Sequence, residues 1–284
     1  MAADLKQFRS AAVRIRPVCG CEVWLSWRSV LFLHDEKNSA MNEDFRNIRT
    51  IVFDADDTLW ENEGRFRAAE REAGEILKEY ASFQEMSSSL YSIEVKNMPD
   101  YGFGAMAFTL SMLENAVRVS GGKMGNGKIS GSRLTGEQVS QILEVGRGLL
   151  HNPATPFDGV KETLAGLRAS GRFCLACFTK GDLLDQGHKL DRSGLRPYFD
   201  YVKITSDKTK EAYSELFGEL GVSAREVLSV GNSFKSDIAP VLEMGGSGIY
   251  IPAENTWQLE KMDEYDHDRL FRLREFSEIL ALVL

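Results

Sequence analysis

The sequence predicts an α/β protein, with a Rossmann-like parallel sheet flanked by helices and a mostly helical cap domain inserted into it. Three observations support this fold class. Short apolar runs recur along the chain, and helical stretches separate the later runs, which is typical of a parallel sheet with both faces covered. A gap of about 110 residues after the first run is also far longer than a βαβ unit of roughly 30 residues.

Five apolar runs are expected to form the strands of the sheet. They lie at residues 50–53, 173–178, 201–204, 227–230 and 248–251. The helices that separate or follow them are predicted at residues 160–169, 183–190, 210–220 and 238–244. Right-handed crossovers would bring the carboxyl ends of the strands to one edge, where such sheets bind ligands.

The long gap is expected to hold the cap, at residues 62–153, between core segments 49–61 and 154–284. Its main helices are predicted at residues 65–80, 105–119 and 135–150, and the last begins with a capping-box pattern. Residues 120–127 are rich in glycine, so we expect a loop there.

Residues 1–48 are interpreted as an N-terminal extension of uncertain order. The first 40 residues are basic and poor in acids, and they lack the apolar core and cleavage site of a secretory signal. Met41 lies shortly before the first strand, so an extension or upstream start that adds nothing to the core is favoured over an organelle targeting segment.

The overall composition is that of a soluble globular protein. An apolar fraction of 43% and a charged fraction of 27% argue against a disordered, collagen-like or coiled-coil chain. The net charge of −8 repels nucleic-acid phosphates, and no apolar run approaches the roughly 20 residues that cross a bilayer. We therefore expect a cytoplasmic protein that binds neither nucleic acid nor membrane.

Cys174 and Cys177 have the C-x-x-C spacing of zinc and redox sites. They lie within a predicted strand, however, where residues three apart point to opposite faces. Four cysteines in 284 residues also do not form the disulfide framework of a small secreted domain. We interpret the pair as small buried apolar residues.

Acidic residues follow the first strand directly, at Asp54, Asp56 and Asp57. Alone, such a turn is more often a solvated loop or a helix cap. A second acid, Asp237, follows a later strand and a glycine turn, and polar residues end two more strands. Carboxylates held together beside a buried sheet are costly unless a cation binds them, so this pattern favours a metal and a phosphate.

These strand ends resemble the four motifs of the haloacid dehalogenase superfamily. Residues 54–59 resemble its first motif, D-x-D-x-T-L, and Thr179 resembles the Ser/Thr of the second. Lys208 resembles the lysine of the third motif, and residues 231–237 resemble the metal-binding fourth. The match extends from about residue 49 to 252, and the inserted segment is similar to a C1-type cap. The segment from Thr179 to Lys208 also resembles a branch of phosphatases.

The resemblance implies a Mg²⁺-dependent hydrolase of small phosphate esters. Asp54 would attack phosphorus to form an aspartyl-phosphate, and Asp56 would act first as acid and then as base. Mg²⁺ would bind the Asp54 carboxylate, the Asp56 carbonyl and Asp237. Many members carry aspartate where Asn232 stands, so we assign Asn232 a supporting role.

The resemblance also implies a phosphate site. Thr179 would donate a hydrogen bond to the phosphoryl group, Lys180 would contribute to binding it, and Lys208 would neutralise it. Lys180, Lys203 and Lys210 are rivals for the third-motif role. Lys208 is preferred because Tyr213 follows at the spacing of an inward helix residue in this branch.

Three other functions compete with the hydrolase. A sugar-phosphate mutase shares the same acids and cap type, and a non-catalytic binding protein would use the same fold. A dehalogenase is disfavoured because that branch lacks an acid at the position of Asp56. Residues after the first motif (Trp60, Asn62, Glu63 and Arg65) either contact substrate or pack at the cap hinge.

Overall fold

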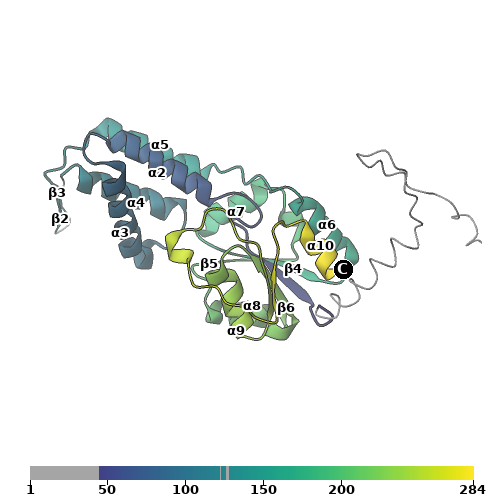
Figure 1. Ribbon diagram of the computed structural model, residues 1–284. Helices are drawn as coiled ribbons and strands as arrows, with labels where there is room; N and C mark the ends of the chain where they lie inside the picture. The colour runs from purple at the N-terminus through teal and green to yellow at the C-terminus, as the bar shows by residue number, and fades with distance from the viewer. Residues whose placement is uncertain (1–44, 122, 126–127) are drawn as a thin grey trace, which may run out of the picture. The chain divides into compact units, whose positions relative to one another are not determined.

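The structure is a computed structural model that describes residues 45–284 except 122 and 126–127 (Figure 1). Residues Asn47–Ala281 form one compact unit. Residues 1–44 of the predicted extension, with Met41, lie outside the described residues. The sheet and the pocket at its carboxyl edge both belong to the unit Asn47–Ala281.

Six parallel strands form the core sheet. In spatial order they are β5 (Tyr201–Thr205), β4 (Cys174–Lys180), β1 (Thr50–Phe53), β6 (Val227–Gly231), β7 (Ser247–Tyr250) and β8 (Leu270–Arg272). The first strand in the sequence therefore lies in the middle, paired with β4 on one side and β6 on the other. The predicted fold class is confirmed.

Helices cover both faces of this sheet (Figure 1). They are α6 (Val160–Ser170), α7 (Leu183–Arg192), α8 (Lys210–Leu220), α9 (Ala239–Glu243) and α10 (Glu278–Val283). The chain moves outward through β4 to β5 and then returns to β6, so right-handed crossovers place α7 and α8 on opposite faces. Val52 and Phe178 point to the α8 face, where they pack with Tyr213.

Short helices complete the core. Three 3₁₀ turns lie at η1 (Arg196–Tyr198), η2 (Ala224–Glu226) and η4 (Gln258–Glu260), and η3 (Phe234–Ile238) is a π-helical turn. The π-helical turn η3 continues directly into α9, so helical structure begins four residues earlier than the predicted start at 238.

Of the five described helices between β1 and β4 in the sequence, the first four form a bundle with its own apolar core. They are α2 (Glu63–Leu77), α3 (Phe83–Tyr101), α4 (Ala105–Val119) and α5 (Gly136–Leu150). Leu77, Met86, Met112 and Ile142 meet in that core and are almost fully buried. We propose residues 62–153 as the boundaries of this cap.

Two features of the cap differ from the prediction. Helix α3 was not predicted, because three consecutive serines and Pro99 mask its apolar period; a Ser82–Glu85 capping box begins it. The loop predicted at 120–127 was wrong in part, because β2 (Lys123–Gly125) and β3 (Lys128–Ser130) pair as an antiparallel hairpin. The sequence Asn126-Gly127 is the strongest two-residue hairpin signal, which the glycine count obscured.

Two further predictions, on membrane-spanning helices and on the cysteine pair, can be compared with the described residues. None of their helices is both long and apolar enough to cross a membrane. Cys174 and Cys177 are free thiols on β4, and burial raises the pKa of Cys177 to about 12. Cys177 is therefore an inert core residue, as predicted. Cys174 is only partly buried, so the prediction of a buried pair was wrong for this residue.

Candidate active site

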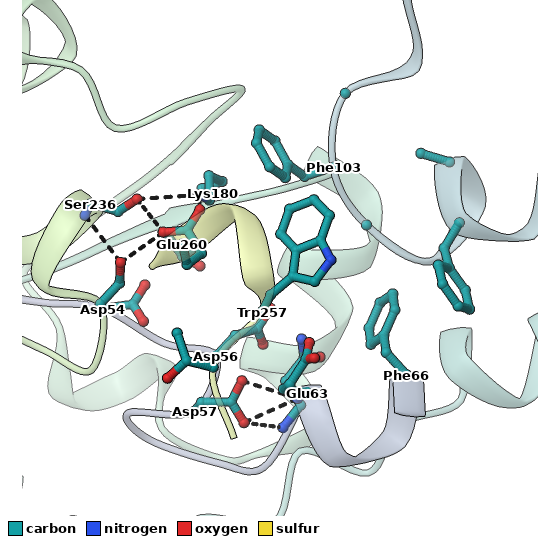
Figure 2. Close-up of a pocket in the computed structure, with 18 of the residues that line it drawn as sticks. Asp54, Asp56, Asp57, Glu63, Phe66, Phe103, Lys180, Ser236, Trp257 and Glu260 are labelled. Atoms are coloured by element: carbon teal, nitrogen blue, oxygen red, sulfur yellow. Dashed lines mark hydrogen bonds and ion pairs between the residues drawn. The ribbon is translucent and has the colours of Figure 1, made fainter. Parts of the chain in front are cut away.

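A pocket lies at the carboxyl edge of the sheet (Figure 2). Its floor comes from residues at the ends of β1, β4 and β6 and from the loop after β5, and its walls come from α2, α3, α4 and residues 255–260. The residues predicted for the site all line it. They are Asp54, Asp56, Thr179, Lys180, Lys208, Asn232 and Asp237. The parallel topology thus brings together side chains that are far apart in the sequence.

The Lys208 ammonium lies between two buried carboxylates at the pocket floor. Its Nζ donates to Asp54 Oδ1 over 2.5 Å and to Asp237 Oδ1 over 2.7 Å. Burial disfavours the ammonium, but Asp237 and Asp54 outweigh that effect and hold the pKa of Lys208 well above its usual value. Burial, with Asp237 adding to it, raises the pKa of Asp54 to about 7 despite Lys208.

The rival lysines make other contacts. Lys203 donates to Glu219 over 3.0 Å on the outer side of α8, and Lys210 pairs with Glu243 while half exposed. Below Lys208, the ring of Tyr213 is buried and its hydroxyl donates to the Ser236 carbonyl over 3.1 Å. Lys208 is therefore the lysine that the structure places between the acids.

Asp237 occupies space that only a glycine leaves free. A Cβ at Gly231 would lie 2.2 Å from Asp237 Oδ2, so any side chain at Gly231 would displace the carboxylate. The Ser233 amide donates to that same oxygen over 2.9 Å, which leaves Oδ1 for Lys208. The glycine turn after β6 thus sets the position of the acid.

The Asn232 side chain faces three oxygens. With its amide nitrogen turned toward these acceptors, it donates to Asp54 Oδ2 over 3.2 Å, to the Asp56 carbonyl over 3.1 Å and to Thr58 Oγ1 over 3.0 Å. Asp54 Oδ2 and the Asp56 carbonyl therefore converge on one point. An amide satisfies them there, whereas an aspartate would repel the Asp54 carboxylate.

The two side chains at the end of β4 differ in their contacts. Thr179 Oγ1 is buried and has no hydrogen-bond partner among the described residues, although it lines the pocket. Lys180 pairs with Glu260, donates to Ser236 Oγ over 3.3 Å and lies over the Phe103 ring. The orphaned hydroxyl is suited to a phosphate oxygen, which would supply the missing acceptor.

Glu260 was not found by sequence reasoning. It lies in η4 and accepts from Ser233 Oγ over 2.7 Å and Ser236 Oγ over 2.5 Å. Burial acts against its ionised form, but Lys180 and these hydroxyls hold the pKa of Glu260 at about 2. The segment around it has no regular apolar period that would have drawn attention to it.

Asp57 serves the hinge rather than the pocket floor. Its φ of 59° turns the chain sharply, and its carboxylate accepts from the Asn62 amide over 2.8 Å and from the Glu63 amide. Burial raises the pKa of Asp57 to about 7. The side chain therefore caps the start of α2 and ties the first motif to the cap, which is the helix-cap interpretation of an acidic turn.

The carboxylate of Asp56 is held by three donors. Trp60 Nε1 donates to Oδ1 over 2.8 Å, and Gln186 Nε2 donates to Oδ2 over 2.7 Å. Lys189 Nζ contacts both oxygens, at 2.8 and 2.7 Å. Sequence reasoning missed Gln186 and Lys189. The signal was the inverted polarity of α7, in which these polar residues are buried while two leucines, Leu183 and Leu184, are exposed.

The cap contributes acids and aromatic rings to the pocket walls. Glu63, Glu70 and Glu94 line it, and burial, with Glu70 and Glu63 adding to it, raises the pKa of Glu94 to about 8. Phe103 of the cap packs edge to face on Trp257 of the core, with ring centroids 5.8 Å apart (Figure 2). Of the residues predicted near the hinge, Asn62 and Glu63 reach the pocket, and Trp60 is fully buried.

Comparison with known proteins shows the family of this chain. A family model described as haloacid dehalogenase-like hydrolase matches residues 48–245. The chain belongs to the haloacid dehalogenase-like hydrolases. Two glyceraldehyde 3-phosphate phosphatases are similar to it. The one from Methanocaldococcus jannaschii is 27% identical over 82% of this chain and 97% of its own length. The one from Methanothermobacter thermautotrophicus is 23% identical over 74% and 88%.

A solved structure of the same family is also similar. It is a haloacid dehalogenase-like family hydrolase from Xanthomonas campestris, 32% identical, with a TM-score of 0.71 over 83% of this chain and 90% of that one. The predicted enzyme class, a hydrolase of this family with phosphatases among its relatives, is confirmed.

The donor set at the pocket floor fits the divalent metal that members of this family use. Among the described residues no three His, Cys, Asp or Glu side chains form a metal cage. Mg²⁺ does not need one, because it binds through one or two carboxylates, waters and substrate phosphate. Asp54 Oδ2 and the Asp56 carbonyl converge, and Asp54 and Asp237 already share a cation, the Lys208 ammonium.

Proposed function

We propose that this protein is a Mg²⁺-dependent phosphomonoester hydrolase that acts on a small phosphorylated metabolite through an aspartyl-phosphate. The observation that carries the proposal is the Lys208 ammonium held between Asp54 and Asp237, at the floor of a pocket whose Thr179 hydroxyl lacks a partner among the described residues. In a member of this family, these residues supply a nucleophile, charge compensation and a phosphate contact.

The chain's residues divide the chemistry between them. Asp54 attacks phosphorus in line, so a bond forms to its carboxylate oxygen as the alcohol leaves. Asp56 gives that alcohol its proton and then takes one from the water that hydrolyses the aspartyl-phosphate. Lys208 holds the Asp54 carboxylate in place through Oδ1, and Thr179, Lys180 and Lys208 bind the phosphoryl oxygens.

The metal would be held by the Asp54 carboxylate, the Asp56 carbonyl and Asp237, with Asn232 in support. When bound, Mg²⁺ supplies positive charge against the phosphoryl oxygens and helps to orient them. The two carboxylates and Lys208 together carry one net negative charge, so a divalent ion would reverse the sign of the floor and favour an anionic substrate.

The pocket favours a hydrolase over a sugar-phosphate mutase. A mutase binds a bisphosphate, and therefore needs a second cationic site across the pocket from the first. The opposite wall instead carries Glu63, Glu70 and Glu94, and its Arg67 is paired with Glu63 over 3.2 Å. A second phosphate would meet acidic side chains there and no unpaired cation among these residues. We infer a substrate with one phosphate and an uncharged alcohol part, as in the aldose phosphate of the curated relatives.

Phosphate release tests the proposal. The purified protein is assayed with glyceraldehyde 3-phosphate, other sugar monophosphates and p-nitrophenyl phosphate, with Mg²⁺ and with excess chelator. We expect metal-dependent release with at least one sugar phosphate, and none from Asp54→Asn. Turnover that requires a catalytic amount of a sugar bisphosphate would identify a mutase. The absence of turnover with every ester would favour a binding protein. A cytoplasmic location stays a prediction.

A further inference from the structure

The side chain of Asp56 has every hydrogen-bonding position filled. A carboxylate offers about four lone-pair sites. Trp60 and Lys189 contact Oδ1, and Gln186 and Lys189 contact Oδ2, all between 2.7 and 2.8 Å. A side chain that exchanges a proton with substrate must admit the substrate oxygen at one of these positions, so such complete coordination requires an explanation.

Lys189 is the only charged member of this set of donors among the described residues, and it is deeply buried. Its side chain is 3% exposed, and besides Asp56 it contacts Asn62 Oδ1 over 3.2 Å and Asp185 Oδ2 at 3.8 Å. Burying an ammonium is expensive unless it is paired. The helix α7 presents Lys189 inward while Leu183 and Leu184 stay exposed, so packing alone does not explain its position.

The neighbours of Lys189 come from three parts of the chain. Asp56 follows β1, Asn62 immediately precedes cap helix α2, and Gln186 lies one turn before Lys189 on α7. Gln186 also donates to the Lys180 carbonyl over 3.1 Å, which ties the set to the end of β4. Movement of Asp56 relative to the phosphate site would therefore break several hydrogen bonds at once.

We propose that Lys189, which no motif includes, is the positioning residue for Asp56, the side chain that transfers protons. With Gln186 and Trp60, it orients the Asp56 carboxylate toward the leaving-group oxygen of the substrate. This inference rests on the proposed function. Lys189 contacts both carboxylate oxygens, and one of these contacts would be released when the alcohol oxygen of the substrate takes its place. Displacement of a catalytic group by about 1 Å can lower a rate roughly 100-fold, which sets the scale of the contribution.

The role predicts a dependence on the leaving group. In Lys189→Met, Asp56 keeps Trp60 and Gln186 but loses its charged anchor. We expect kcat for a sugar phosphate, whose alkoxide is a poor leaving group, to fall roughly 10- to 100-fold. The single-turnover phosphorylation step with p-nitrophenyl phosphate needs little protonation and should change less than about 3-fold. KM should change little, because the phosphate contacts are intact.

A double-mutant cycle separates positioning from general support of the fold. If Lys189 acts through Asp56, Lys189→Met added to Asp56→Asn should lower the sugar phosphate rate no further. Lys189→Gln, which keeps a buried donor, serves if Lys189→Met does not fold, and it should lie between wild type and methionine. Lys210→Met is the matched control, since that lysine is half exposed and outside the pocket.

Three results would overturn the inference. Equal losses with both leaving groups would show a general structural role, and additive losses in the cycle would show that Lys189 does not act through Asp56. A rise in KM for every substrate at unchanged kcat would make Lys189 a substrate-binding residue. None of these bears on the proposed function, whose failure would appear separately as full activity of Asp54→Asn.

Discussion

Glu94 in the cap wall offers a quantitative test of the electrostatics of the pocket. Burial, together with Glu70 and Glu63, raises the pKa of this carboxyl from 4.5 to about 8 in the folded protein. In the unfolded chain the Glu94 carboxyl is solvated and keeps its ordinary pKa. Replacing it by the nearly isosteric Glu94→Gln removes the ionisation and leaves the shape of the wall almost unchanged.

The sign follows from proton binding. Between about pH 4.5 and 8 the folded state holds this proton and the unfolded state has lost it, so stability falls as pH rises through that window. At roughly 1.4 kcal/mol per pKa unit, the interval from 4.5 to about 8 sets an upper bound of about 5 kcal/mol. Solvent in the pocket screens part of this, and we expect about 1–3 kcal/mol.

Urea unfolding at several pH values measures the effect. The free energy of unfolding of Glu94→Gln should match that of wild type near pH 4.5 and exceed it by about 1–3 kcal/mol at pH 8.5. Glu72→Gln, an exposed residue of α2, is the matched control and should show no such divergence. If the difference between Glu94→Gln and wild type were the same at both pH values, or if wild type were the more stable at pH 8.5, the reasoning would be refuted.

Three further predictions concern the floor of the pocket. Lys208→Met should lose about 3–5 kcal/mol of stability in urea, because it leaves two buried carboxylates uncompensated, whereas Lys210→Met should lose almost none; equal losses would contradict the assignment. Chelation should stop turnover, and in a magnesium titration Asp237→Asn should raise the half-maximal concentration far more than Asn232→Ala; the reverse order would remove Asp237 from the metal site. Asp56→Asn should slow aspartyl-phosphate formation most with poor leaving groups, and rapid-quench rates that fall equally for all leaving groups would rule out the acid role.

Most of the core sheet was predictable because its strands are buried on both faces. Such strands appear in the sequence as continuous apolar runs. The polar residues that follow each strand are therefore easy to locate. Local pattern placed polar residues at these strand ends, and the resemblance to the family's motifs singled out Asp54, Thr179, Lys208 and Asp237. Parallel topology brings them to one edge. Strand β8 was missed because it is a short edge strand with two partly buried residues and one exposed residue.

The rest of the pocket depends on contacts that no local pattern encodes. Lys189 reaches Asp56 across 133 positions, and Glu260 reaches Lys180 across 80. Their partners are set by how α7 and η4 dock on the core. The acidic wall around Glu94 was hidden for another reason, because α3 itself was not predicted. Asp57, by contrast, shows that an acid in a first motif can be a helix cap.

The central claim is that Asp54 forms a covalent bond to phosphorus. Wild-type protein is mixed with a turned-over sugar phosphate and Mg²⁺, quenched in acid within the first turnover, digested and analysed by mass spectrometry. We predict that the peptide containing Asp54 gains the mass of one phosphoryl group, and that Asp54→Asn shows no such gain anywhere in the chain. An unmodified Asp54 peptide during rapid turnover, or a phosphoryl group on another residue, would contradict the account.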